Sequence, residues 1–415
     1  MKKIVACIFI VLFVFSLCGC NTKVNQEPIS RAPRNLSETL TAEETKPEKL
    51  DEEFIDAQQD FALNLFSAYY SADKGNVCIS PYSLSFALSI VANGADGKTA
   101  QEIEDVLMGG IEKDKWNKNM YSLLKEREKV IKTKQADSIW IDKEYKTVNA
   151  DFLKVSKNYF NANVYQTDLN KYGTEDINAW VKEKTDGKIE NIADSLHPNT
   201  KLYIADALFF ELRWATSHYS ELVTEETFFT LNGEEQTAKM MNSSFTGYYY
   251  INTKEAVGFI KPLQVDYSFV ALMPDENVNF VDYISSLNGT KFRDILNSVE
   301  YAQIDTGMPF FKVENDIIFN NTLKKMGINR AYDDTLADFS KISKTDSLVL
   351  GVTRQKTLLN VDIEGVRGSS ASGQEVIYRS LNFPEISLTL NRPFVYVIIN
   401  KQGIPIFIGA VTKLY

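Results

Sequence analysis

One stretch near the end of the chain organises the rest, and it reads Glu364-Gly365-Val366-Arg367-Gly368-Ser369-Ser370-Ala371-Ser372-Gly373-Gln374-Glu375-Val376-Ile377-Tyr378-Arg379-Ser380. Its first half consists of small residues, whereas its second half is β-branched and aromatic and ends in Arg379-Ser380. Segments typical of strands lie on both sides, at residues 358–362, 386–390 and 394–400. A small, polar segment between strands is normally a flexible loop. Here the small residues would also enter a sheet without steric conflict, and this double character is the first indication of function.

The first residues of the chain indicate export. Lys2-Lys3 precedes an apolar run at residues 4–17, which is too short for a membrane span. The run ends in Leu17-Cys18-Gly19-Cys20, which resembles the cleavage box of bacterial lipoproteins. In this interpretation residues 1–19 are a signal peptide, and a lipid on Cys20 anchors the protein to the outer face of a bacterial membrane. The alternative is an ordinary cleaved signal peptide with incidental cysteines.

Composition divides the remainder into two parts. Residues 21–50 contain no aromatic residue and are rich in Thr, Glu, Asn, Lys and Pro. This composition predicts a disordered tether that reaches on the order of 30 Å. Residues 51–415 contain neither a second linker nor an internal repeat, so we expect one large domain. Cys78 is the only cysteine of this domain, which excludes an internal disulfide, and the net charge of −10 argues against a nucleic-acid partner.

Helical and strand patterns are mixed along this domain, with helices more frequent early and strands more frequent late. Ser80 and Pro81 are typical of the N-cap and first turn of a helix, and Thr99-Ala100-Gln101-Glu102 is typical of a capping box that opens the next one. Residues 202–210 form a nearly continuous apolar run, as expected of a central strand buried on both faces. With the short strands predicted between residues 227 and 273, the pattern indicates an α+β protein built on large, mostly antiparallel sheets.

No residue pattern typical of an enzyme or a metal site is present. The two histidines, His197 and His218, have no metal-ligating neighbour at helical spacing. Gly97-Lys98-Thr99 resembles the end of a phosphate-binding loop, but the position of its first glycine is occupied by Ala92. Residues 368–372 resemble a nucleophile elbow in which Ser372 replaces the second glycine. We therefore expect a protein that is not an enzyme and that needs no metal or cofactor.

Several motifs spread along the domain point to one family. They are Asn76-Val77-Cys78-Ile79-Ser80-Pro81-Tyr82-Ser83, Ala92-Asn93-Gly94-Ala95-Asp96-Gly97-Lys98-Thr99, Ile177-Asn178-Ala179-Trp180-Val181 with Thr185-Asp186-Gly187-Lys188-Ile189, residues 205–214, Asn391-Arg392-Pro393-Phe394 and Ile406-Phe407-Ile408-Gly409. With these motifs the chain resembles the serpin family from about residue 54 to its end. The resemblance implies a fold of three β-sheets and about nine helices, in which the stretch that starts at Glu364 is an exposed reactive-centre loop.

The resemblance also assigns roles to individual residues. By the spacing usual in the family, counting from Gly365 places the bond cut by the target protease between Arg379 and Ser380, with Ile377 and Tyr378 as protease subsites. The hinge would consist of Glu364, Gly365, Val366, Arg367, Gly368, Ser369, Ser370, Ala371 and Ser372. The shutter and breach positions, which control opening of the main sheet, would be Ser80, Ser83, Asp206, Trp214 and Gln355. Asp206 and Gln355 replace the usual Asn and His, and their side chains can hydrogen-bond to each other.

The mechanism implied by the resemblance is suicide inhibition. A trypsin-like serine protease takes the guanidinium of Arg379 into its primary pocket and attacks the Arg379 carbonyl. The freed loop then inserts into the main sheet as a new strand and carries the acylated protease over a distance on the order of 45 Å. Alternation along such a strand would turn Val366, Gly368, Ser370, Ser372, Gln374 and Val376 towards the core, and none of these residues is charged.

Departures from the family pattern keep other functions open. Ile363 and Arg367 stand where acids are usual, and Gly373 and Gln374 are weak strand formers that would slow insertion. A second hypothesis is therefore a non-inhibitory binding module or protease decoy. A third is inhibition of papain-like cysteine proteases, with which Tyr378 beside Arg379 is compatible. We expect a monomer whose partner, for an inhibitor, is the target protease and which needs no polyanion.

Overall fold

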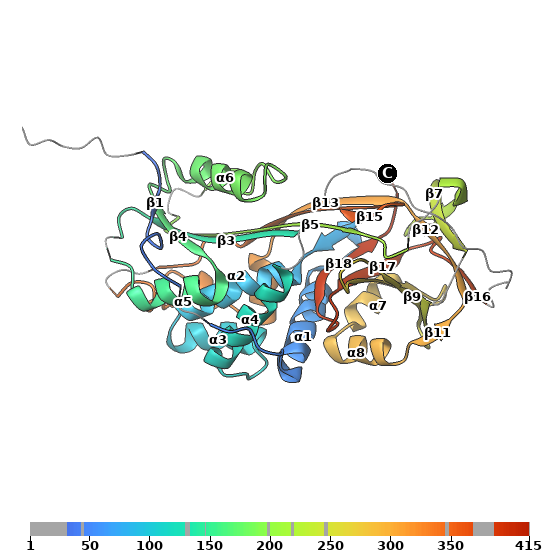
Figure 1. Cartoon of the computed structure of the whole chain (residues 1–415), viewed down its shortest axis with the longest axis horizontal. Coiled ribbons are helices and arrows are strands. Elements are labelled where there is room, and N and C mark those ends of the chain that lie inside the picture. Colours follow the sequence, from blue (N-terminus) through green and yellow to red (C-terminus); the bar gives the residue numbers. More distant parts are fainter. Residues whose placement is uncertain are drawn as a thin grey trace, which may run out of the picture. The chain divides into compact units, whose positions relative to one another are not determined.

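The computed structural model describes residues 31–42, 45–128, 133–145, 147–196, 200–216, 220–244, 248–344, 348–367 and 386–414. The chain divides into two units, residues 1–32 and 33–415, and the fold described here is that of the second unit (Figure 1). Within the described ranges, no helix has the length and apolar character needed to cross a membrane. The same ranges contain no cluster of His, Cys, Asp and Glu side chains placed to hold a metal ion.

Helix α2 (Pro81–Gly94) is the central helix of this unit. Its N-cap is Ser80, whose Oγ accepts a hydrogen bond from the backbone N–H of Ser83 at 3.2 Å. All of its residues except Asn93 are buried, which is the pattern of a helix inside a core. The other helices in the described residues are α1 (Glu52–Tyr69), α3 (Gly97–Leu107), α4 (Lys113–Arg127), α5 (Ala150–Phe160), α6 (Gly173–Lys184), α7 (Phe280–Ser286), α8 (Gly289–Asn297) and α9 (Asn320–Met326).

In the described ranges the strands form three sheets. Sheet A has the order β1-β4-β3-β5-β15-β14-β13, and its strands are β1 (Arg34–Asn35), β4 (Asn163–Thr167), β3 (Thr133–Asp142), β5 (Leu202–Arg213), β15 (Gly365–Arg367), β14 (Arg354–Asp362) and β13 (Phe311–Ile318). Sheet B has the order β11-β8-β9-β10-β17-β18-β2, with β11 (Glu300–Ala302), β8 (Tyr248–Asn252), β9 (Ala256–Pro262), β10 (Ser268–Pro274), β17 (Phe394–Ile399), β18 (Pro405–Val411) and β2 (Val77–Ile79). Sheet C has the order β16-β12-β7-β6, with β16 (Ile386–Thr389), β12 (Ile304–Pro309), β7 (Glu235–Ser244) and β6 (Val223–Phe229).

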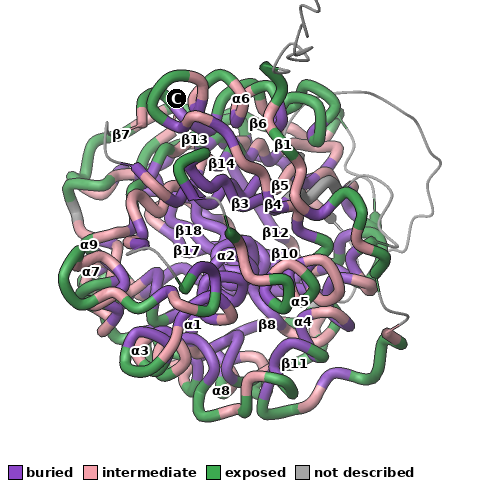
Figure 2. The backbone as a smooth tube through the Cα atoms, turned by 90° about the vertical axis from the view of Figure 1, so that its left-hand side faces the viewer, coloured by how far each residue is buried: buried purple, intermediate pink, exposed green. Residues whose placement is uncertain are grey.

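Sheet A is covered on both faces. Helix α2 lies on one face and α6 on the other (Figure 1). Beneath α6, Trp140 of β3 and Tyr203 of β5 pack with Ile177, Trp180 and Val181 in a small separate core. The main core lies on the α2 side, where every residue of β17 and β18 is buried (Figure 2). Sheet A is therefore a layer between two cores, so a change in its strand spacing affects both.

The compact unit begins earlier than the predicted boundary at residue 51. Arg34 and Asn35 form β1, which pairs antiparallel with β4 at the edge of sheet A. Ser37 is fully buried, and its hydroxyl accepts a hydrogen bond from the Val164 N–H at 3.1 Å. Leu50 is also buried. Composition alone predicts a tether for residues 21–50. It cannot reveal the edge strand β1, because that strand is held by backbone hydrogen bonds, which any polar sequence can form.

The structure confirms the α+β fold class, and it corrects one local prediction. Helix α3 begins at Gly97, and Asp96 is the residue whose side chain accepts a hydrogen bond from the first turn. Thr99, which the sequence places at the start of this helix, accepts instead from the N–H of Asp338 at 3.0 Å. The hydroxyl of Thr99 therefore hydrogen-bonds to a distant segment and does not cap the helix as the capping-box motif predicts.

Candidate functional site: the hinge and the slot in sheet A

The first residues of the predicted loop are a strand in the middle of sheet A. Strand β15 lies between β5 and β14 and pairs antiparallel with both. Val366 is opposite Leu212 on one side and Val361 on the other, and all three side chains are buried. Val366 thus faces the core, as alternation along the predicted strand requires. Arg367 contributes its backbone to β15.

Gly365 is required at the turn into β15. Its φ of +151° lies in the region that favours glycine, and a Cβ at this position would overlap the carbonyl oxygen of Leu212. The turn before it is held by two hydrogen bonds. The Glu364 N–H donates to Asp362 Oδ1 at 2.9 Å, and the Glu364 carbonyl accepts from the Trp214 N–H at 3.2 Å. The hinge therefore enters the sheet at one defined point.

Below β15, the two neighbouring strands face each other without a strand between them. Residues 202–210 of β5 pair with β3, and residues 354–359 of β14 pair with β13. In the described part of the chain, neither stretch has a ladder partner on its other side. A cavity of about 390 Å³ lies here, and its walls include Leu208, Phe209, Thr357 and Leu358. This region, which we call the slot, has the geometry that accepts one antiparallel strand.

A short segment after α6 crosses the slot and is fastened on both sides. This segment, residues 189–194, is called the strap. On the α6 side, the Asn178 amide accepts from the N–H groups of Ile192 and Ala193, both at 2.9 Å, and donates to the Ala193 carbonyl at 2.6 Å. From β5, the hydroxyl of Tyr203 donates to the Ile192 carbonyl at 3.2 Å. Residues 189–191 line the slot cavity, so the strap covers it.

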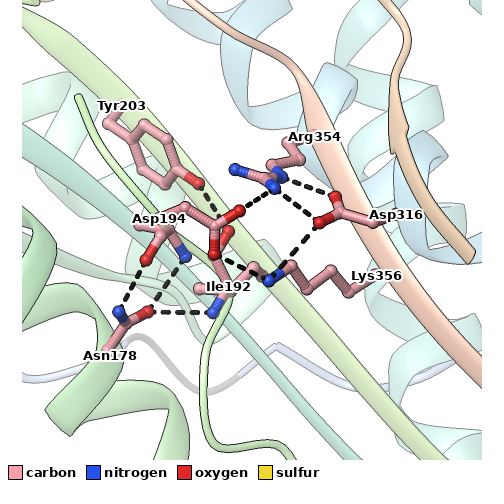
Figure 3. Close-up of polar contacts among 8 residues, drawn as sticks. Asn178, Ile192, Asp194, Tyr203, Asp316, Arg354 and Lys356 are labelled. Atoms are coloured by element: carbon pink, nitrogen blue, oxygen red, sulfur yellow. Dashed lines mark hydrogen bonds and ion pairs between the residues drawn. The ribbon is translucent and has the colours of Figure 1, made fainter. Parts of the chain in front are cut away.

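On the far side of the slot, Asp194 is clasped by two cations from β14. Its carboxylate pairs with the Arg354 guanidinium and with Lys356 Nζ, the latter at 3.1 Å, and Asp316 of β13 pairs with the same two cations (Figure 3). Hydrogen bonds from Lys356 and Arg354 lower the pKa of Asp194. Asp194 is therefore ionised at neutral pH and ties the strap to β14. Nothing local in the sequence distinguishes this aspartate, because its partners are more than a hundred residues away.

Trp214, which was predicted as a breach residue, lies at the hinge end of the slot. Its indole N–H donates to the Asp362 carbonyl at 2.7 Å. Lys261 of β9 lies over the indole ring with Nζ 4.9 Å from the centroid. Burial lowers the pKa of Lys261 to about 7. Trp214 thus joins β5 to the end of β14 directly beside the hinge.

The predicted shutter residues lie together, but their hydrogen bonds differ from the prediction. The Gln355 amide binds the backbone of Ser80, accepting from its N–H at 2.8 Å and donating to its carbonyl at 2.9 Å. Asp206 instead accepts from the hydroxyl of Ser83. Gln355 and Asp206 therefore do not form the expected pair. A backbone N–H and C=O before a helix need one acceptor and one donor, and the amide supplies both.

The structure adds one residue to this cluster. Asp137 of β3 is buried and lies directly opposite Asp206 in the ladder. The sequence feature that could have identified Asp137 is an acid on the same face of the predicted strand as Ile139 and Ile141. Arg379, Ser380, Ile377, Tyr378 and the hinge residues 368–372 lie outside the described residues, as does Cys20.

Comparison with known proteins agrees with this geometry. The family model described as "Serpin (serine protease inhibitor)" matches residues 56–414. Iripin-5 of Ixodes ricinus is 29% identical, covering 83% of this chain and 91% of the relative. The thermophilic serpin tengpin in its native state superposes with a TM-score of 0.86 at 33% identity, covering 92% of this chain and 100% of tengpin. Tengpin in its latent state gives a TM-score of 0.76 at 33% identity, covering 89% and 100%.

The chain belongs to the serpin family. Members of this family are generally inhibitors that bind serine proteases, not enzymes themselves. The arrangement of nine helices and three sheets in the described residues is the fold of this family.

Proposed function

We propose that this chain inhibits Arg-specific, trypsin-like serine proteases as a suicide substrate, trapping the acylated protease by inserting its loop into the slot. The observation that carries the proposal is the position of β15, a three-residue strand at the mouth of the slot. The proposed strand continues a ladder that has already started, so its register is fixed in advance.

The register of β15 supports burial of the predicted face. Val366 is opposite Leu212 and Val361, so continuing the two ladders brings Ser370 opposite Leu208 and Thr357. Each inserted residue gains backbone partners on one or both sides, and each hydrogen bond contributes about 1 kcal/mol. Over the slot these contributions add to a stabilisation on the order of 10 kcal/mol, which would drive the insertion.

The proposed chemistry takes place at the bond between Arg379 and Ser380. The serine hydroxyl of the protease attacks the carbonyl carbon of Arg379, its proton passes to the departing amine of Ser380, and an ester joins the protease to Arg379. Insertion of the loop then separates this ester from the Ser380 side and distorts the protease before water can cleave the ester. A guanidinium selects proteases with an acidic primary pocket through paired hydrogen bonds.

The proposal places this activity at the outer face of a bacterial membrane, with lipid on Cys20. Because the compact unit begins at Pro33, the tether would be residues 21–32, with an end-to-end distance of about 20 Å. A membrane-tethered inhibitor would protect the surface on which it is anchored.

A second candidate function is a protease decoy that is cleaved without trapping. The observation that favours it is the clasp between Asp194 and the two cations of β14, which holds the strap across the slot. Trapping requires the loop to insert faster than the ester is hydrolysed, and a strap held across the slot slows insertion.

The test mixes residues 21–415 with trypsin and separates the products on a denaturing gel. The proposal predicts a band at the summed mass of the two proteins, and Arg379→Ala should remove it while leaving the fold intact. Cleavage after Arg379 without such a band, at every ratio of the two proteins, would support the decoy instead.

A further inference from the structure

Two acidic side chains lie opposite each other beneath the slot. Asp137 of β3 and Asp206 of β5 are paired in the antiparallel ladder and are 6% and 7% exposed. Asp137 shares its face of β3 with the buried Ile139 and Ile141, and Asp206 shares its face of β5 with the buried Ile204. Because these isoleucines belong to the main core, both acids point to the α2 side of sheet A. Asp206 accepts a hydrogen bond from the Ser83 hydroxyl, and its interaction with Asp137 lowers its pKa. Two buried carboxylates that face each other repel, and one proton held by the pair relieves this repulsion.

The charges around the pair balance one carboxylate and not two. Arg127, at the end of α4 and 8% exposed, is the cation among the described residues whose charge acts on Asp206. Tyr82 of α2 and Tyr267, just before β10, are the other titratable groups on this side. From β14 the neighbouring side chain is Gln355, which is uncharged. With one proton the group of two acids and one arginine is neutral, and without it the group has a buried net charge of −1.

Among the titratable groups named around the pair, only the two acids change their charge in mildly acidic solution. Burial raises the pKa of Asp206 to about 6, although the hydrogen bonds from Ser83 and Asp137 and the charge of Arg127 act in the opposite direction. Burial also raises the pKa of Tyr267 to about 12 and that of Tyr82 still higher, so both phenols stay neutral. The raised pKa means that the proton stabilises the folded state.

A cavity gives water access to the neighbourhood of the pair. It has a volume of about 110 Å³ and is lined by Tyr82, Arg127 and Tyr267 on its inner side and by Val265, which is 54% exposed, on its outer side. Among the described residues, none is a hydrogen-bond partner of Arg127 Nε. A cavity of this size with such a donor is suited to a few water molecules, through which the proton can exchange. At its rim Glu126 pairs with Lys401 at 3.0 Å, so its charge is compensated there.

We propose that Asp137 and Asp206 form a single buried proton-binding site that holds β3 and β5 together over α2, and that loss of the proton loosens this part of sheet A. The stabilisation is complete below the ordinary aspartate pKa and is lost as the pH rises through about 6. Since β5 is one wall of the slot, its loosening would also accelerate insertion, a consequence that rests on the proposed function.

The experiment compares thermal unfolding of residues 21–415 between pH 4 and 6.5 for the natural sequence, Asp206→Asn and Asp137→Asn. Lys261 changes its charge near pH 7, above this range. An amide in place of either acid removes the titration but can still hydrogen-bond. The natural protein should lose up to roughly 100-fold in its folding equilibrium constant across the range, relative to either variant. Asp282→Asn, at an exposed position in α7, is the matched control and should follow the natural protein.

A second measurement does not depend on the variants folding. Infrared spectra of the natural protein should show the band of a protonated carboxylic acid that disappears near pH 6. Parallel pH profiles of stability in all proteins, or no such band above pH 5, would overturn the proposal. The rate of complex formation with trypsin at pH 5.5 and 7 is measured separately. If trypsin is never trapped while the stability profiles differ as expected, the proton site stands and the proposed function fails.

Discussion

The two ends of the slot in sheet A are held in opposite ways. At the hinge end, β15 has entered the sheet and pairs with β5 and β14 through backbone groups. At the strap end, no inserted strand is present among the described residues, and β14 is joined to the strap by charged side chains, with Asp194 bound to Arg354 and Lys356. The first arrangement favours a longer strand, and the second must open before one can pass.

The difference shows how sheet A can begin to accept the loop strand at one end and slow its insertion at the other. Backbone ladders are cooperative and short in range, so β15 fixes the register of any strand that follows. Surface ion pairs are individually weak, with contributions of about 0.2–1 kcal/mol, and they can break and re-form. The hinge end therefore sets where the loop goes, and the strap end influences how fast it goes there.

The largest effect is expected from a charge on the inward face of the inserting strand. Ser370→Glu would bury a carboxylate between Leu208 and Thr357, at a cost of several kcal/mol, without adding a site that trypsin cleaves. We expect trypsin to cleave this variant without forming a covalent complex, reducing the complex yield at least tenfold on a denaturing gel. Ala371→Glu, one residue further on and facing outward, is the matched control and should retain the complex. Equal yields from the two variants would contradict the register that β15 defines.

The next effect tests the hinge end directly. Gly365→Ala introduces a Cβ that overlaps the Leu212 carbonyl at a φ that alanine rarely adopts, so β15 should leave the sheet. The cost is about 2 kcal/mol, which corresponds to a decrease in Tm of roughly 2–3 °C. Gly351→Ala is the control, because the nearest atom to its added Cβ is at 3.6 Å. A Tm unchanged in both variants would show that β15 contributes nothing to the native state.

The smallest effect is expected at the strap end. Asp194→Asn removes the charge that binds Arg354 and Lys356, and insertion should become about 1.5- to 5-fold faster. The measurement is the rate at which the intact chain converts to a heat-stable form during mild warming. Glu190→Gln removes an exposed charge of the same strap that pairs with Lys182 on α6, not with β14, and should leave the rate unchanged. If both variants behave alike, the strap does not act through its clasp to β14.

Local sequence patterns were sufficient to predict the inward face of the hinge and the start of α2. Alternation of small and apolar residues places Val366 towards the core, and the N-cap and proline at Ser80 and Pro81 locate the start of α2. Both are properties of short sequence segments, and the structure shows them where they are expected.

Partners from distant segments could not be predicted in the same way. Asp194 is an ordinary loop acid until β14 brings two cations to it. Asp137 becomes unusual only when the ladder between β3 and β5 places Asp206 opposite. The same holds for β1, whose pairing uses backbone groups that every sequence possesses. Pairings between strands and across loops depend on the whole fold, and a single sequence does not specify them.

The most direct test of strand insertion is the thermal stability of the chain before and after one cut in its loop. Residues 21–415 are cut within residues 368–385 by a protease that is not trapped, and the two forms are heated side by side. A strand that fills the slot adds on the order of 10 kcal/mol, so the cleaved form should unfold roughly 12 °C higher than the intact one. Hydrogen exchange in residues 202–210 and 354–359 should slow at the same time. An unchanged or lower Tm after cleavage would contradict the account, because it would mean that the slot in sheet A does not accept the loop.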